Sequence, residues 1–159
     1  MIKVGDAIPS HKLTAVTADG PKEVTTEELF AGKTVVLFAV PGAFTPTCSA
    51  RHLPGYVQNN EALRAKGVDT IACLAVNDVF VMTAWAKEQA VDNHITMLAD
   101  GSGTFTKALG LELDLTARGL GVRSQRYAMV VRDGRITHLN VEAPGGFEVS
   151  RAETVLAQL

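Results

Sequence analysis

The chain has 159 residues, 47% of them hydrophobic, and a formal net charge of −2 at pH 7. This length suits one domain over residues 1–159 and is too short for two full domains. The chain has no excess of basic residues, which argues against a protein that binds nucleic acids or anionic membranes. Two cysteines, Cys48 and Cys73, are too few for a disulfide scaffold, and this usage is typical of a reducing compartment.

The N-terminal residues lack the apolar segment of a secretory signal. No apolar stretch approaches the ~20 residues that a membrane-spanning helix needs. We therefore expect a cytoplasmic protein without a membrane partner.

The first predicted elements are short. Residues 1–20 hold extended segments. Thr25 and Glu28 have the spacing of a capping box and predict a short helix that ends near Gly32. Residues 34–40 form an unbroken run of β-branched and apolar residues, which is typical of a central strand buried on both faces.

Helices and strands alternate through the middle of the chain. A helix is predicted over 47–66, with a kink at Pro54 because proline removes a backbone hydrogen bond. Asn77 and Asp78 are expected to cap a later helix. The elements predicted after the kinked helix are a buried strand over 68–76, a helix over 77–91, a strand over 95–98 and a short helix or turn over 102–110.

The last part of the chain predicts a hairpin and a helix. The region 119–121 is predicted to be a loop. Strands over 127–131 and 136–141 are joined at Asp133–Gly134, which is a strong hairpin signal. Ser150–Glu153 has the spacing of a second capping box, which would open the last helix. This element order predicts an α/β protein with a mixed central sheet and helices on both faces.

Cys48 lies where a predicted buried strand leads, through a loop, into a predicted helix. A helix N-terminus carries a partial positive charge and free N–H groups, and both favour a thiolate, the reactive form of cysteine. Thr45 and Thr47 offer hydroxyl donors, and Pro41 and Pro46 restrict the loop. The alternative is a buried, inert cysteine, because free cysteines are among the most buried residues.

The neighbouring residues narrow the chemistry of this thiol. A dithiol oxidoreductase would have Cys-x-x-Cys, but Thr45 stands in the first cysteine position, so disulfide exchange within the motif is impossible. A single thiolate with hydroxyl donors suits attack on a small electrophile. His52, four residues after Cys48, is either the base of an acyl-transfer enzyme or, as we prefer, a hydrogen-bonded structural histidine.

The segment Pro41–Cys48, with the sequence PGAFTPTC, resembles the Pro-x-x-x-Thr-x-x-Cys motif of the peroxiredoxins. Its continuation through Ser49–Tyr56 resembles the type II, atypical two-cysteine subfamily. Further similar segments are Val4–Asp6, Val76–Asp78, Arg126–Val131 and Asp133–Gly134, so the resemblance covers nearly the whole chain. It implies a thioredoxin-like fold, in agreement with the predicted element order.

The resemblance implies a thiol-dependent peroxidase for hydrogen peroxide and alkyl hydroperoxides. Cys48 matches the peroxidatic cysteine, whose thiolate attacks a peroxide oxygen and becomes a sulfenic acid. Thr45 matches the hydroxyl donor to the thiolate and the peroxide, and Pro41 matches the proline that shields the site from water. Arg126 matches the arginine that supports the thiolate and polarises the peroxide; Arg123 is a nearby competitor that matches less well. No cofactor is implied, and no metal, because the four histidines show no metal-ligand spacing.

Cys73 lies in a predicted buried strand. It is either a core residue or, as its position in plant-like members of the subfamily implies, a resolving cysteine that forms a disulfide with Cys48. That bond needs Cα atoms within about 7 Å, so local unfolding around Cys48 would be required. Other members carry a C-terminal resolving cysteine, but residues 145–150 offer only Ser150. We therefore favour recycling by glutathione with glutaredoxin, and thioredoxin is the second candidate.

The subfamily also implies a homodimer formed through the active-site edge. Phe44 and Phe80 are candidate contacts, although either could equally be a core residue. Two other functions stay open on the residues alone. One is a thiol-disulfide or glutathione-transfer enzyme that uses Cys48 on disulfides, and the other is a redox-sensing module whose partner reads the oxidation state of Cys48.

Overall fold

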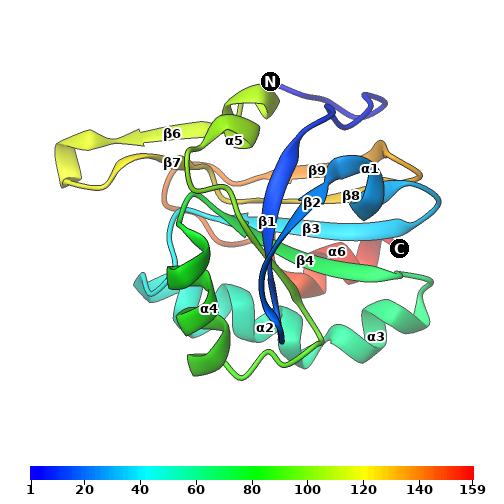
Figure 1. Cartoon of the computed structure of the whole chain (residues 1–159). Coiled ribbons are helices and arrows are strands. Elements are labelled where there is room, and N and C mark those ends of the chain that lie inside the picture. The colour runs from blue at the N-terminus through cyan, green and yellow to red at the C-terminus, as the bar shows by residue number, and fades with distance from the viewer.

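A seven-stranded mixed sheet forms the centre of the structure, a computed structural model that describes residues 1–159 (Figure 1). Its strands are β1 (Lys12–Thr17), β2 (Gly20–Thr25), β3 (Thr34–Val40), β4 (Thr70–Ala75), β5 (Thr96–Ala99), β8 (Tyr127–Arg132) and β9 (Arg135–Val141). They lie in the order β2-β1-β5-β4-β3-β8-β9. Strand β4 is parallel to both β3 and β5, and all other neighbours are antiparallel.

Strand β3 is buried along its length from Val35 to Val40. It lies between β4 and β8, so both of its edges are paired. Its two faces enter two separate hydrophobic clusters, with Val36, Phe38 and Val40 in one and Val35, Leu37 and Ala39 in the other. The predicted central strand, buried on both faces, is confirmed.

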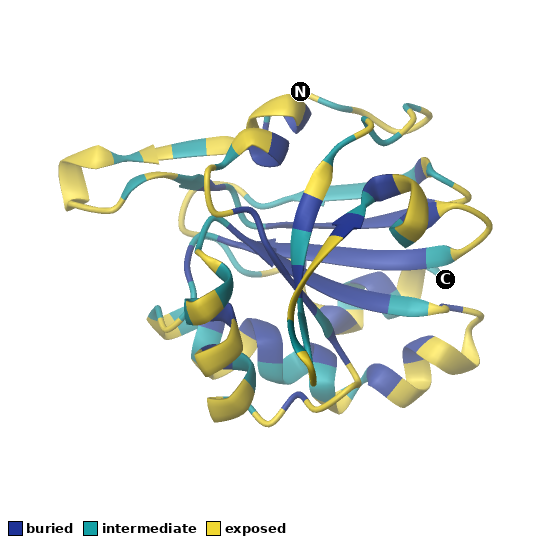
Figure 2. Ribbon diagram, viewed as in Figure 1, coloured by how far each residue is buried: buried dark blue, intermediate teal, exposed yellow.

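Helices cover both faces of this sheet. Four of them contribute buried side chains to the cluster that contains Phe38: α2 (Leu53–Gln58), α3 (Asn60–Ala65), α4 (Val79–Glu88) and α6 (Ala152–Gln158). Two others, α1 (Thr26–Phe30) and α5 (Thr104–Leu109), contribute to the cluster that contains Leu37. In Figure 2 the central strands form a dark, buried layer between these helices. The predicted mixed sheet with helices on both faces is confirmed. No helix has the length and apolarity needed to cross a membrane.

Two local sequence signals are confirmed. At the start of α1, Glu28 N–H donates to Thr25 Oγ1 over 3.2 Å and Thr25 N–H donates to the Glu28 carboxylate over 3.3 Å, which completes the capping box. Between β8 and β9, Asp133 and Gly134 have φ angles of 48° and 78°. A two-residue type I′ turn requires positive φ at both positions.

The helix predicted over 47–66 is confirmed in its extent, but its irregularities do not lie at Pro54, where the kink was predicted. The segment consists of a π-helical turn, η1 (Cys48–His52), followed by α2 and α3, which are separated at Asn59. Pro54 lies in the first turn of α2, where a missing backbone N–H is tolerated. The irregularity therefore falls on the turn that carries Cys48.

The loop predicted over 119–121 is confirmed at residues 119 and 120, but Gly121 begins a strand, and the two strands on either side of this loop were not predicted. A short hairpin, β6 (Glu112–Leu115) and β7 (Gly121–Ser124), lies there and is joined by the single turn η2 (Thr116–Arg118). Exposed and half-buried residues alternate along β6, as in a strand with one covered face. Each strand has only four residues, so this signal was too short to predict it. The hairpin projects away from the main sheet (Figure 1).

The capping box predicted at Ser150–Glu153 does not form. Arg151 is the N-cap of α6, and no side chain caps this helix. Ser150 instead donates from its hydroxyl to Glu142 over 2.6 Å. Glu142, eight residues earlier in the chain, thus accepts the hydroxyl that local spacing assigned to the helix.

Candidate active site

Cys48 is the first residue of η1, directly after the loop 41–47 that follows β3. Its side chain is fully buried. Two donors reach its sulfur: the Thr45 hydroxyl lies 2.9 Å from Sγ and the Arg126 Nη2 lies 3.1 Å from it. Charge-assisted hydrogen bonds of this kind stabilise an anion in a water-poor site, so the environment is built for a thiolate.

The Thr45 hydroxyl can serve both protonation states of this sulfur. It lies 2.7 Å from the Gly42 carbonyl oxygen as well as 2.9 Å from Cys48 Sγ. A hydroxyl has one hydrogen and can also accept. It donates to a thiolate, whereas a thiol donates to it and its own hydrogen then turns to Gly42.

The sheet register brings Arg126 to Cys48. In the antiparallel pair of β3 and β8, Ala39 lies opposite Tyr127. The residue before Tyr127 therefore emerges at the end of β3 where the loop to Cys48 begins. Arg126 lies beside Cys48 because β8 pairs with β3, although 77 intervening residues separate it from Cys48 in the sequence.

His52 holds the other side of the Arg126 guanidinium. Arg126 Nη1 donates to His52 Nδ1 over 2.8 Å, so His52 Nε2 carries the hydrogen and donates to the Ser150 carbonyl oxygen over 3.1 Å. Burial, and then the charge of Arg126, lowers the pKa of His52 to about 3. The ring is neutral, and both nitrogens are occupied, which fits the preferred structural histidine rather than a base for Cys48.

A segment that the sequence did not predict closes over these groups. We call residues 142–150 the strap. The Phe147 ring lies edge-on to His52, with 5.1 Å between centroids, and 5.9 Å from the Arg126 guanidinium carbon. Glu142 anchors the strap by accepting hydrogen bonds from Ser150 and from the Glu148 N–H. Burial alone would raise the pKa of Glu142, but these hydrogen bonds outweigh it and lower the pKa.

Asn77 has a different task from the predicted one. Asp78 alone caps α4, by accepting from the Val81 N–H over 2.9 Å. The Asn77 side chain accepts from the Ala43 N–H over 2.9 Å and so ties the loop before Cys48 to the end of β4. An asparagine next to a predicted cap gave no signal for this contact.

Cys73 lies in the middle of β4, opposite Phe38 of β3. It is fully buried in the same hydrophobic cluster as Cys48, and both cysteines are free. Burial raises the pKa of the Cys73 thiol. A protonated thiol in a paired central strand is a poor nucleophile.

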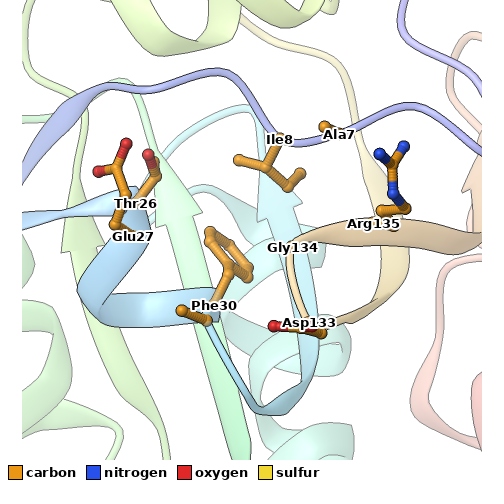
Figure 3. Close-up of a pocket in the computed structure, with 9 residues that line it drawn as sticks. Ala7, Ile8, Thr26, Glu27, Phe30, Asp133, Gly134 and Arg135 are labelled. Carbon is orange, nitrogen blue, oxygen red and sulfur yellow. The ribbon is translucent and has the colours of Figure 1, made fainter.

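A pocket of about 500 Å³ opens beside Cys48 and is lined in part by Pro41, Thr45 and Arg126. A second pocket, of about 260 Å³, lies at the opposite end of β3. In Figure 3, Ile8 and Phe30 lie between Thr26 and Glu27 on one side and Ala7 and Arg135 on the other. The first pocket is the candidate active site, because it alone of the two is lined by Thr45 and Arg126, the residues that donate to Cys48 Sγ. No group of three or more His, Cys, Asp or Glu side chains is arranged to hold a metal ion.

Comparison with known proteins identifies the family. The Redoxin family model matches residues 3–156. Peroxiredoxin-2C of Oryza sativa subsp. japonica is 50% identical over 159 residues, which cover 99% of this chain and 98% of the rice protein. The chain belongs to the peroxiredoxin family. The type II subfamily includes this and the other similar plant relatives, so the predicted subfamily is also confirmed.

Solved peroxiredoxin structures agree with this peroxiredoxin along its whole length. Reduced Prx3 from Vibrio vulnificus, solved in complex with hydrogen peroxide, is 57% identical, with a TM-score of 0.95 and coverage of 99% of both chains. Oxidized Prx3 from the same organism is 58% identical, with a TM-score of 0.91 and full coverage of both chains. The thioredoxin-like fold is confirmed. As a peroxiredoxin, the protein is a thiol peroxidase.

Proposed function

We propose that this peroxiredoxin reduces hydrogen peroxide and alkyl hydroperoxides at Cys48. The observation that carries the proposal is the pair of donors on its sulfur, Thr45 at 2.9 Å and Arg126 at 3.1 Å, beside an open pocket. A Vibrio vulnificus relative, 57% identical, was solved with hydrogen peroxide bound. That relative supports the same small substrate here.

The chemical step moves one electron pair from sulfur to oxygen. The Cys48 thiolate attacks the terminal peroxide oxygen, an S–O bond forms and the O–O bond breaks. Cys48 becomes a sulfenic acid, and the leaving oxygen takes up a proton to become water or an alcohol. Thr45 and Arg126 donate hydrogen bonds to the reacting atoms as negative charge moves onto the leaving oxygen. Pro41 lines the pocket, and its proposed role is to shield the Cys48 sulfur from water.

The test is peroxide consumption by the wild type and by Cys48→Ser. The wild type with a thiol reductant is expected to consume hydrogen peroxide, whereas the variant is expected to do so no faster than the reductant alone. Circular dichroism checks that the variant is folded. Consumption by Cys48→Ser at the wild-type rate would overturn the proposal.

An outside thiol completes the proposed cycle, with glutathione and glutaredoxin as the first candidate and thioredoxin as the second. The burial of Cys73 in a paired central strand supports this, and the sequence contains no third cysteine. A coupled assay with each reductant, at equal peroxide concentration, ranks the two. We also propose that the protein works in the cytoplasm, where such reductants keep thiols reduced.

Replacing Cys73 by alanine is expected to leave turnover with the external reductant within about twofold of the wild type. The reason is that a buried, protonated thiol takes no part in resolution. Intact mass after one equivalent of peroxide is expected to show a sulfenic acid, or a glutathione adduct when glutathione is present. An internal disulfide, together with loss of turnover in Cys73→Ala, would contradict this prediction.

The proposed oligomer is a homodimer formed through the active-site edge. Phe44 and Phe80 are 49% and 74% exposed, so they are not core residues and are free to meet a partner. We expect light scattering to give a dimer mass for the wild type and a lower mass for Phe80→Asp, because a carboxylate opposes burial. Val4→Asp, at a residue 57% exposed, is the matched control and is expected to remain dimeric. A monomeric wild type would contradict the dimer.

A further inference from the structure

The pocket beside Cys48 combines an apolar wall with positive charge. Leucines from the β6–β7 hairpin line one side, namely Leu113, Leu115 and Leu120. Three arginines line the same pocket: Arg118, Arg123 and Arg126. At about 500 Å³, the pocket is much larger than a hydrogen peroxide molecule needs and has the size of a small organic ligand site.

Arg123 is fixed in position and keeps donors to spare. Its Nε donates to the Leu120 carbonyl oxygen over 2.8 Å, and its Nη1 lies 3.3 Å from the Val76 carbonyl oxygen. Both are neutral acceptors, and a guanidinium has five N–H groups. A methyl group placed on Gly42 would lie 3.3 Å from Arg123 Nη1 and 3.2 Å from Thr45 Cγ2. The guanidinium therefore lies against the loop that carries Thr45.

No carboxylate of the protein neutralises this arginine. The two ion pairs of the structure are those of Lys3 with Asp6 and of Lys12 with Glu23. Glu142 is the single acidic residue of the pocket lining. Three donors from the strap already occupy its Oε2. The pocket thus has a net positive charge in a chain whose net charge is −2.

We propose that this pocket is a subsite for organic hydroperoxides that carry a carboxylate. Arg123 binds the carboxylate, Arg118 adds a second, exposed positive charge, and the hairpin leucines cover the hydrocarbon. A guanidinium fork matches a carboxylate in shape and charge. The peroxide group reacts at Cys48 by the step already given, and the carboxylate itself does not react. This inference rests on the proposed function and specifies its substrate class.

The test compares two probes that differ in one charge. They are cumene hydroperoxide bearing a para-carboxylate, and the methyl ester of that compound. Wild-type kcat/KM is expected to be about five- to tenfold higher for the acid, because a partly exposed charge pair has this strength. Added salt is expected to reduce the ratio by screening. The ratio is internal to each variant, so a general loss of activity cancels.

Arg123→Gln is expected to lower the ratio of acid to ester below about twofold, as loss of the partner charge requires. Arg132→Gln makes the same charge change at the exposed far end of β8 and is expected to keep the wild-type ratio. A ratio of one in the wild type, or an unchanged ratio in Arg123→Gln, would overturn the subsite while hydrogen peroxide is still consumed. If hydrogen peroxide is not consumed either, the proposed function itself fails.

Discussion

Replacing Arg126 by methionine is expected to lower kcat/KM for hydrogen peroxide by about 10²–10³-fold, the usual cost of removing one donor to a developing oxyanion. Arg126 donates to Cys48 Sγ over 3.1 Å and is the charged group nearest the reacting sulfur. Its loss removes a hydrogen bond that stabilises both the thiolate and the negative charge that forms as the O–O bond breaks. Stopped-flow measurement of peroxide consumption gives the rate, and the ultraviolet absorbance of the thiolate gives the ionised fraction of Cys48.

Two further variants separate charge from geometry. Arg126→Lys keeps the positive charge but loses the planar fork that joins Cys48 and His52, so its rate is expected to lie between those of the wild type and Arg126→Met. Arg132→Met, at the end of β8 far from Arg126, is expected to match the wild type. A loss of less than about fivefold in Arg126→Met would show that this arginine does not stabilise the transition state.

The sequence could predict the part of the site that is local. Thr45 lies in the loop after β3 and Cys48 follows it three residues later at the start of η1, so one helical turn after a buried strand is enough to bring hydroxyl and sulfur together. Arg126 is different, because its place beside Cys48 depends on β8 pairing with β3 in one register. A single sequence does not contain that pairing, and the arginine was found through family resemblance.

The strap could not be predicted because one of its contacts is long-range and another replaces a predicted helix cap. Phe147 packs on His52, which is 95 positions earlier in the sequence, and Ser150 binds Glu142 instead of capping the helix that follows it. Capping rules consider only groups within one helical turn of the hydroxyl, whereas the half-buried Glu142 carboxylate accepts it here from eight residues away. The β6–β7 hairpin was not predicted for another reason: strands of four residues are too short to show a clear alternation of hydrophobic and polar residues.

His52 connects these two parts of the site. It accepts from Arg126 on one side and donates to the strap at Ser150 on the other, so the guanidinium is oriented through a neutral imidazole. A protonated ring would have no acceptor for Arg126 and would place two positive charges in contact. The observed position of Arg126 therefore requires the uncharged form of His52, and that requirement makes folding sensitive to pH.

The wild-type protein is expected to lose about 2 kcal/mol of unfolding free energy between pH 7 and pH 5 because of His52 alone. The folded-state pKa of His52 is about 3, below the ordinary value of 6.5. Between these values the unfolded chain binds a proton that the folded chain rejects. The contribution of neutral His52 to the unfolding free energy is therefore fully present above pH 6.5. It is lost as the pH falls towards 3, at about 1.4 kcal/mol per pH unit.

Urea denaturation of the wild type and of His52→Asn at several pH values tests this expectation. Asparagine has an oxygen that can accept from Arg126 and an amide that can donate, but it does not titrate. Three other histidines, His11, His94 and His138, remain in both proteins, so the difference between the two pH profiles isolates His52. We expect the variant to be less stable at pH 7, because its side chain is smaller, and to have the shallower slope towards acid. Parallel profiles would mean that His52 takes up its proton at the same pH in the folded and the unfolded chain. The orientation of Arg126 would then need another explanation.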